Sequence, residues 1–420
     1  MIQTFHLQPG VTLRCFPDNR FKQGLLSIQF LRLMRKEEAA FNALIPSVLL
    51  RGTQSAPDLR AITQKLDDLY GAAVGCIVRQ IGDYQTTGLQ VRFISDRYAM
   101  DGDKILEPTI DFLEQLLFHP VLEKGAFSRS FVSGEKRNLI AAIESRRNDK
   151  RAYANSQMLK KLCAKDPYGL SRIGTVTQVR KITAKSAYQH YQKILRESPV
   201  EIFYVGEADP NQVAALLKPL FEGRERNYVN LPEQTPWRSC RSGSYTETMD
   251  VSQAKLAMGF VTPITIRDPE FAAMQVCNAI LGGGMTNLLF INIREKLSLC
   301  YDIGSSYHGA KGLLTIGAGI DADKFDLVYA QIMEQLEVCR NGSFSEEIFD
   351  SAKQGLLSSL SGIHDSPGGI EGYYSSGLLS GQRLNPQQYA QAVGQVTREQ
   401  VAACAQKLQL HTTYFLKGVQ

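Results

Sequence analysis

The chain has 420 residues, of which 44% are apolar and 21% are charged, so it is long enough for two hydrophobic cores and has the composition of a globular protein. The 47 basic and 42 acidic residues are scattered and give a formal net charge of +5, with no basic block or basic-aromatic interleaving, which argues against nucleic-acid binding. No apolar run is long enough to cross a membrane and the N-terminus lacks a signal-peptide pattern, so we expect a cytoplasmic protein without membrane contact.

The first half of the chain shows helical and strand-like patterns in blocks rather than in strict alternation. Residues 11–16 and 25–33 are predicted to pair as a hairpin, and residues 37–50 to form a helix that kinks or breaks at Pro46. A further helix is predicted after residues 55–58, which have the spacing of a capping box. Additional strands are expected on both sides of residues 82–83 and at 200–206, and additional helices at 105–118, 124–163 with an interruption near 148–149, and 211–221. This order favours an α+β fold with antiparallel sheets.

The second half repeats the order of the first. Residues 179–183 precede a helix and a strand that ends at Gly206, and residues 393–397 precede a helix and a strand that ends at Gly418. We therefore predict two tandem duplicated domains, each an antiparallel sheet with helices packed on one face. The predicted boundaries are residues 1–223 for the first domain, 224–247 for a polar linker and 248–420 for the second domain. Two unrelated α+β domains are the alternative.

The eight cysteines are dispersed without a C-x-x-C pair, so we expect reduced thiols rather than a disulfide framework. Cys300 lies beside Tyr301, but no histidine is adjacent in sequence to activate it as a nucleophile.

The most informative stretch is residues 281–307, LGGGMTNLLFINIREKLSLCYDIGSSY. A helix that starts at residues 268–269 is predicted to stop at three glycines: Gly282, Gly283 and Gly284. These glycines do not fit a phosphate-binding loop, because Walker A requires Gly-Lys-Ser/Thr and the dinucleotide fingerprint requires a third glycine where this chain has Asn287.

Arg294 is expected near the end of the following helix, and Tyr301 at the start of a strand seven residues later. A turn between them can bring the guanidinium and the phenol to one side, where they can hold a carbonyl oxygen as charge develops on it. The alternative is that Arg294 is a surface arginine paired with Glu295.

Residues 281–307 resemble the second-half signature of the pitrilysin/insulinase metallopeptidase family, especially its two-domain processing-peptidase branch. In that family LGGG, a short helix, Arg-Glu-Lys and a following Tyr recur in this order, and the Arg and Tyr contact bound peptide opposite the zinc. The resemblance covers nearly the whole chain, because family members carry the same tandem duplication. It implies substrate binding by Arg294, Tyr301 and the three glycines.

In the same family the first half carries H-x-x-E-H, in which two histidines bind zinc and the glutamate activates water. Counting back from residues 51–53, the histidines fall on Ala43 and Ser47, and the catalytic glutamate falls on Pro46. The distant fourth ligand falls on Ala142, and Glu144 is two residues away on another helix face. Because none of these side chains is an adequate zinc donor or base, we expect a degenerate zinc site and no metal or cofactor on this chain.

The six histidines are far apart in sequence and form no H-x-x-E or H-x₃-H pair, although a site assembled from distant residues stays open. No Gly-x-Ser-x-Gly elbow is present either.

The resemblance implies a non-catalytic subunit of a heteromeric zinc metallopeptidase that processes peptides. The chain would supply the chamber wall and the Arg294/Tyr301 contacts, and a zinc-bearing sibling in a heterodimer would supply metal and base. A structural or peptide-holding subunit with no role in catalysis is the alternative. The substrate peptide, the partner's identity and whether a homodimer forms without that partner stay open.

Overall fold

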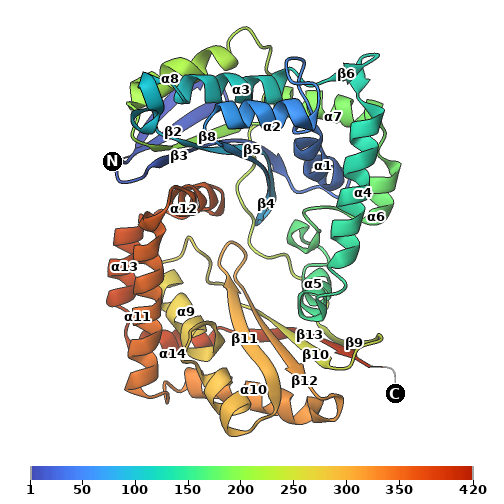
Figure 1. The fold of residues 1–420 in the computed structure, drawn as a ribbon. Coiled ribbons are helices and arrows are strands. Elements are labelled where there is room, and N and C mark those ends of the chain that lie inside the picture. Colours follow the sequence, from blue (N-terminus) through green and yellow to red (C-terminus); the bar gives the residue numbers. More distant parts are fainter. Residues whose placement is uncertain (1, 419–420) are drawn as a thin grey trace. The chain divides into compact units, whose positions relative to one another are not determined.

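The computed structural model describes residues 2–418 and separates into two compact units (Figure 1). The first unit comprises the chain up to Glu144 together with Leu170–Glu233 and Ser366–Ser376. The second comprises Ser145–Gly169, Gln234–Asp365 and the chain from Gly377 onward. Each unit therefore includes a segment from the other half of the sequence. The predicted domains, with boundaries at residues 223 and 248, are contiguous and do not include these exchanged segments.

The first unit is built on a six-stranded sheet with the order β1-β2-β8-β3-β5-β4. Its strands are β1 (Gln3–Gln8), β2 (Val11–Pro17), β3 (Gln23–Leu33), β4 (Ala73–Ile81), β5 (Tyr84–Ile94) and β8 (Val200–Gly206). Neighbouring strands are antiparallel except β2 and β8, which are parallel. A separate two-stranded ribbon joins β6 (Leu122–Glu123) to β7 (Ala126–Phe127).

The predicted hairpin between residues 11–16 and 25–33 is wrong, although both strands exist. The partner of β2 in the opening hairpin is β1, and β8 lies between β2 and β3. A strand that arrives almost 200 residues later leaves no mark on the local alternation of polarity, so the local pattern could not reveal it.

The helices of the first unit are α1 (Ala39–Leu49), α2 (Leu59–Asp68), α3 (Leu106–Phe118), α4 (Arg129–Ser145), α6 (Val176–Lys181), α7 (Ala184–Glu197) and α8 (Pro210–Leu217). In Figure 1 α2, α3 and α8 lie over one face of the sheet. Alternate residues of each strand fill the core on that face, as Leu26, Ile28 and Phe30 of β3 do.

The other face of this sheet carries the first part of α12 (Pro367–Ser380). Ile370 packs there with Phe16, Phe203 and Val205. Glu371 is buried on the same face and accepts hydrogen bonds from side chains of both β3 and β4.

Two helix starts differ from the sequence prediction. The cap of α2 is Asp58, whose side chain accepts from the Ala61 N–H, and not Ser55. Helix α9 (Phe271–Asn278) begins without a side-chain cap, because Asp268 instead accepts hydrogen bonds from Thr265.

The second unit contains a five-stranded sheet with the order β11-β12-β10-β13-β9. Its strands are β9 (Gly243–Thr248), β10 (Ala254–Val261), β11 (Cys300–His308), β12 (Leu313–Ile320) and β13 (Gln409–Lys417), and only β13 and β9 pair in parallel. The predicted linker 224–247 therefore ends inside a strand of this sheet. In addition to α9, its helices are α5 (Lys150–Leu162), α10 (Phe325–Arg340), α11 (Glu346–Gly362), α13 (Pro386–Gly394) and α14 (Arg398–Gln406).

Helix α5 packs on β10, β12 and β13, on the face of the sheet opposite α10 and α14 (Figure 1). Met158 and Leu162 of α5 share a core cluster with Ala257 and Leu416. Gly259 allows this approach, since a Cβ atom there would lie 2.5 Å from the Met158 sulfur. The predicted α+β class is confirmed, and a single helix covers the second face of each sheet.

Candidate functional site

The positions of the predicted zinc motif lie on α1, which runs without a break through Pro46. Ala43 and Pro46 are buried, and Ser47 is partly buried with its hydroxyl 3.6 Å from the Cys76 sulfur on β4. The predicted break at Pro46 is therefore wrong.

A substitute donor explains why α1 tolerates the proline. Pro46 has no N–H for the carbonyl of Asn42, one helical turn earlier. That carbonyl accepts instead from the Thr87 hydroxyl of β5 at 2.7 Å, in a buried position. The backbone acceptor is thus satisfied from the sheet rather than from within the helix.

The side chain of Asn42 extends this polar network. Its amide nitrogen donates to Gln85 Oε1 at 2.7 Å, and its carbonyl oxygen lies 2.8 Å from His190 Nε2 of α7. Burial lowers the pKa of His190 to about 4, so the ring is neutral near pH 7 and Nε2 is the donor. These contacts connect α1 with β5 and α7.

The fourth position of the motif, Ala142, is exposed on α4. One carboxylate on the same helix is close to the end of α1: Glu135 Oε1 lies 3.4 Å from Arg51 Nη1. Glu135 is therefore paired with a cation of the protein itself. Among residues 2–418 no group of three or more His, Cys, Asp or Glu side chains is arranged to hold a metal ion.

The family's zinc does not fit the residues present on α1 and α4. Alanine and proline offer no donor atom, and the Ser47 hydroxyl faces a thiol rather than a second ligand. No metal-dependent step can be derived from this part of the chain.

In the second unit the three glycines belong to a widened helical turn. Residues of η5 (Ala279–Gly283) are π-helical, and the chain becomes extended at Gly284, whose N–H donates to the carbonyl of Ala279 five residues back. The helix therefore continues through Gly282 and Gly283 and stops at the third glycine. A Cβ atom on Gly282 would lie 2.9 Å from the backbone nitrogen of Ser305 on β11, so that glycine permits close packing against the strand.

Asn287 occupies the place where a dinucleotide-binding loop would need glycine. Its side-chain oxygen accepts from the Phe290 N–H at 2.8 Å, and its amide donates to the carbonyl of Gly284 at 2.7 Å. Asn287 therefore links the glycine turn to the start of the next helix.

Arg294 is exposed on this next helix, η6 (Leu289–Lys296), which is also π-helical. Its guanidinium lies over the Phe290 ring, 4.7 Å from the ring centre, and 3.8 Å from a Glu295 oxygen. Single π-helical turns are uncommon and are frequently found at functional sites. One π-helical segment of this unit precedes Arg294 and the other contains it.

Tyr301 lies at a β-bulge. Cys300 pairs with Ile320 and Asp302 pairs with Gly319, so Tyr301 is the extra residue in β11. Bulges re-aim side chains at sheet edges, and β11 is an edge strand. The Tyr301 side chain is 60% exposed, and its hydroxyl donates to Asp321 at 3.2 Å.

Two neighbours of this tyrosine affect its surroundings. Lys324 lies 2.9 Å from Asp321, and this ammonium, with the Tyr301 hydroxyl, lowers the pKa of the Asp321 carboxyl. Burial raises the pKa of the Cys300 thiol to about 11, which keeps it protonated near pH 7 and unsuited to nucleophilic attack. Asp321 was not among the residues predicted from the sequence, although the hairpin register places the end of β12 beside the start of β11.

The turn between Arg294 and Tyr301 is under local backbone strain. Ser298 has φ of 50°, in the left-handed region that L-residues other than Asn and Asp seldom adopt. Arg294 and Tyr301 have different partners. Arg294 contacts Phe290 and Glu295, whereas Tyr301 donates a hydrogen bond to Asp321.

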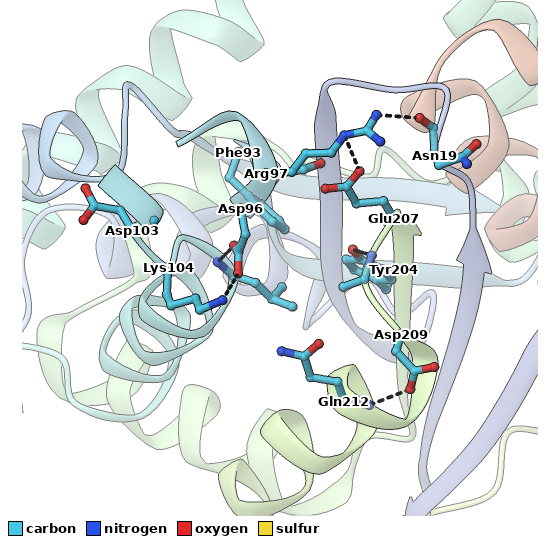
Figure 2. Close-up of a pocket in the computed structure, with 14 residues that line it drawn as sticks. Asn19, Phe93, Asp96, Arg97, Asp103, Lys104, Tyr204, Glu207, Asp209 and Gln212 are labelled. Atoms are coloured by element: carbon cyan, nitrogen blue, oxygen red, sulfur yellow. Dashed lines mark hydrogen bonds and ion pairs between the residues drawn. The ribbon is translucent and has the colours of Figure 1, made fainter. Parts of the chain in front are cut away.

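A cavity in the first unit is lined by the loops that follow β5 and β8 (Figure 2), and its volume is about 580 Å³. Its carboxylates have protein partners: Asp96 accepts from the N–H groups that begin α3, Asp209 accepts from those that begin α8, and Glu207 lies 2.8 Å from Arg97. None of the degenerate zinc positions is among the lining residues. These groups stabilise helix ends and loops, so the cavity is not the candidate site.

Comparisons with known proteins identify relatives of this chain that are described as inactive metalloproteases. The profile of the peptidase M16 inactive domain matches residues 181–356. The probable inactive metalloprotease YmfF of Bacillus subtilis is 31% identical over 411 residues, which is 98% of this chain and 96% of that protein.

Two solved structures share the fold over the full length. A conserved protein from Enterococcus faecalis V583 superposes with a TM-score of 0.92 at 28% identity and covers 100% of this chain and 99% of its own. A peptidase M16 inactive domain from Pseudomonas fluorescens has a TM-score of 0.81 at 19% identity, with 100% and 98% covered. No helix within residues 2–418 has the length and apolar character that a membrane crossing requires.

Proposed function

Because this chain belongs to the peptidase M16 family, as the pitrilysin/insulinase resemblance predicted, we propose that it is the non-catalytic subunit of a two-chain peptide-processing metallopeptidase. A zinc-bearing sibling of the same family would be the partner and would supply metal and general base. This chain would supply substrate contacts. The proposed compartment is the cytoplasm.

The observation that carries this proposal is an asymmetry between the two units. In the first unit the zinc positions are two buried apolar residues, an exposed alanine and a serine that is hydrogen-bonded to a thiol. In the second unit Arg294 and Tyr301 are both exposed, one on a π-helical turn and the other on a bulge. Strained or irregular backbone is retained when the surrounding structure compensates for it, and it is concentrated at functional sites.

In the proposed complex Arg294 and Tyr301 bind the peptide backbone beside the partner's zinc. An arginine and a phenol can both donate to a carbonyl oxygen, and this donation strengthens as the oxygen becomes negative during attack by water. For the phenol to donate to a substrate, it must exchange its bond to Asp321 for the new one. The strands β4 and β11 lie at the edges of their sheets, and an extended peptide can add to such an edge through main-chain hydrogen bonds.

The test combines the purified chain with a zinc-bearing sibling from the same cell and a quenched fluorescent peptide. The proposal expects cleavage that neither chain shows alone. Arg294→Ala or Tyr301→Phe should lower turnover by about 10²-fold, the typical loss for one donor to a developing oxyanion, without preventing assembly. Lys296→Ala, which removes an exposed cation from the same helix, is the matched control. Equal turnover by parent and Arg294→Ala complexes would contradict a substrate role.

A structural or peptide-holding subunit is the second candidate, and the stacking of Arg294 on Phe290 favours it. In that case Arg294 is a packing residue. The same mixture then shows no cleavage beyond that of the sibling alone, and Arg294→Ala lowers the melting temperature instead.

A further inference from the structure

The positive charge of this protein is concentrated in one segment of 20 residues. Residues 146–165 contain seven basic residues and one acidic residue, Asp149, so their formal net charge is +6. Since the whole chain carries +5, the other 400 residues together carry −1. The basic residues are Arg146, Arg147, Lys150, Arg151, Lys160, Lys161 and Lys165.

This basic segment consists of α5 and the residues on each side of it, all in the second unit. Six of the seven basic side chains are exposed, and Lys150 is partly buried. The apolar side of α5 is held on the sheet through Met158 and Leu162. The segment is thus a fixed element of the sheet's second face rather than a loose tail.

The acidic groups within the segment and directly after it do not neutralise it, because each already has a structural role. Asp149 caps α5 by accepting from the Ala152 N–H at 2.9 Å. Asp166, the next residue after the segment, is fully buried with Lys311 at 3.1 Å. The six exposed cations therefore make the potential of the segment itself positive, and Glu247 of β9, which accepts a hydrogen bond from Tyr153, reduces it on that side.

The basic segment is joined directly to the strand that carries Tyr301. Arg151 Nη1 lies 3.2 Å from Asp302, the residue after Tyr301 in β11. Asp302 in turn lies 3.5 Å from Lys255 of β10. One carboxylate is thus shared by two cations, and on the other side of Tyr301 the Asp321 carboxylate is paired with Lys324.

We propose that α5 and β11 together form a binding face that selects acidic peptides. The proposal rests on the proposed function in that β11 presents Tyr301 to a peptide, and it adds the substrate class. A peptide extended along β11 would pass Arg151, which already contacts that strand through Asp302, and exposed charges interact over about 10 Å at moderate ionic strength. Exposed Lys and Arg side chains attract such groups without fixing one sequence, which suits selection by class.

The experiment measures binding by the purified full-length chain without any partner. Fluorescent 12-residue peptides of three kinds, Glu-rich, neutral and Lys-rich, are titrated with the chain and followed by anisotropy. The Glu-rich peptide should bind about tenfold tighter than the neutral one at low salt and within about twofold of it at 0.5 M salt, because salt screens exposed charges.

Two charge variants locate the effect. Arg146→Gln/Arg147→Gln/Arg151→Gln should remove most of the preference for the Glu-rich peptide. Lys160→Gln/Lys161→Gln/Lys165→Gln leaves the Arg151–Asp302 pair intact and should weaken the preference by a smaller amount, because Lys161 lies over Tyr245 of β9 at the opposite edge of the sheet. The matched control is Arg180→Gln/Lys181→Gln/Lys185→Gln, which removes three exposed cations from the first unit and should change nothing.

Each outcome decides the proposal. Equal binding of all three peptides, or equal loss in the control variant, overturns it. A single-stranded oligothymidylate of 12 nucleotides that binds as tightly as the Glu-rich peptide would also overturn it, because the face would then be a general polyanion site. The binding experiment contains no partner, so a negative result there does not refute partner-dependent cleavage. If the chain binds acidic peptides selectively but the mixed complex cleaves no peptide, only the proposed function is refuted.

Discussion

The proline at the position of the catalytic glutamate makes a quantitative test of how α1 is stabilised. Thr87 donates to the carbonyl of Asn42, the acceptor that Pro46 cannot serve. We consider Thr87→Val and Pro46→Ala, singly and together. In the double variant the new alanine supplies a backbone N–H to the Asn42 carbonyl, as in any regular helix.

The magnitude follows from burial. Asn42 and Thr87 are both buried, so removing the hydroxyl leaves a carbonyl without a donor and should cost about 1–3 kcal/mol. In the Pro46→Ala background the carbonyl keeps a donor, so Thr87→Val should cost less by about 1 kcal/mol or more. Pro46→Ala alone should be near neutral, because its new N–H meets an acceptor that is already bonded.

Urea denaturation of all four proteins measures the free energies of unfolding and the coupling between the two changes. Ser47→Ala serves as a control on the same helix, since its hydroxyl contacts only the Cys76 sulfur in a partly buried position. Equal costs of Thr87→Val in both backgrounds would refute the claim that the threonine replaces the missing helical bond.

Three further changes test other parts of the structure. Burial lowers the pKa of His190 to about 4 from an ordinary value of 6.5, so the unfolded state binds more protons between these two pH values. The free energy of unfolding should therefore fall by up to about 3 kcal/mol as the pH drops from 6.5 to 4. Denaturation curves of His190→Gln should show a smaller dependence on pH. Glu371→Ala should lower the free energy of unfolding by about 3–5 kcal/mol, because Arg79 and Gln29 lose the buried carboxylate that they contact at 2.9 and 2.6 Å. A decrease under about 1 kcal/mol would show that water replaces the carboxylate. Ser298→Gly should be neutral or stabilising by up to about 1 kcal/mol, since glycine adopts positive φ freely, and a clear loss in melting temperature would mean that the serine side chain is needed.

Local patterns predicted most elements of the fold. The strands at β2, β3, β5 and β8, the interruption between α4 and α5, and the extended stretch at β11 all appear where polarity alternation or helix periodicity placed them. The errors came from partners that are distant in sequence. The strand β8 separates β2 from β3, and β9 extends the second sheet into the predicted linker.

For the candidate site, too, the sequence predicted some features and could not predict others. Residue types alone identified Ala43, Pro46 and Ser47 as inadequate for zinc, because the chemistry of a ligand depends on which atoms are present. The sequence could not predict that Asp321 bonds Tyr301 or that Tyr301 is a bulge residue, since both depend on hairpin register. Whether Arg294 and Tyr301 bind substrate stays a prediction.

The basic segment was missed for a different reason. Charges counted over the whole chain appear balanced, and the seven cations of residues 146–165 occur as three adjacent pairs and a single lysine rather than as one run. Their grouping emerges only when α5 is recognised as one helix whose apolar side is covered.

Helix α5 belongs to the second unit although it comes from the first half of the sequence, and residues 366–376 belong to the first unit although they come from the second half. This exchange limits where the chain can be cut into fragments that fold. An expression fragment that ends in the linker would lack Ile370 and Glu371, and would leave Phe203 open to water and Arg79 without its counter-charge. A fragment that begins after the linker would lack α5 and uncover Leu416. Neither truncated half should be stable by itself, so domain swaps with relatives need breakpoints that carry each crossing helix along with the sheet it covers.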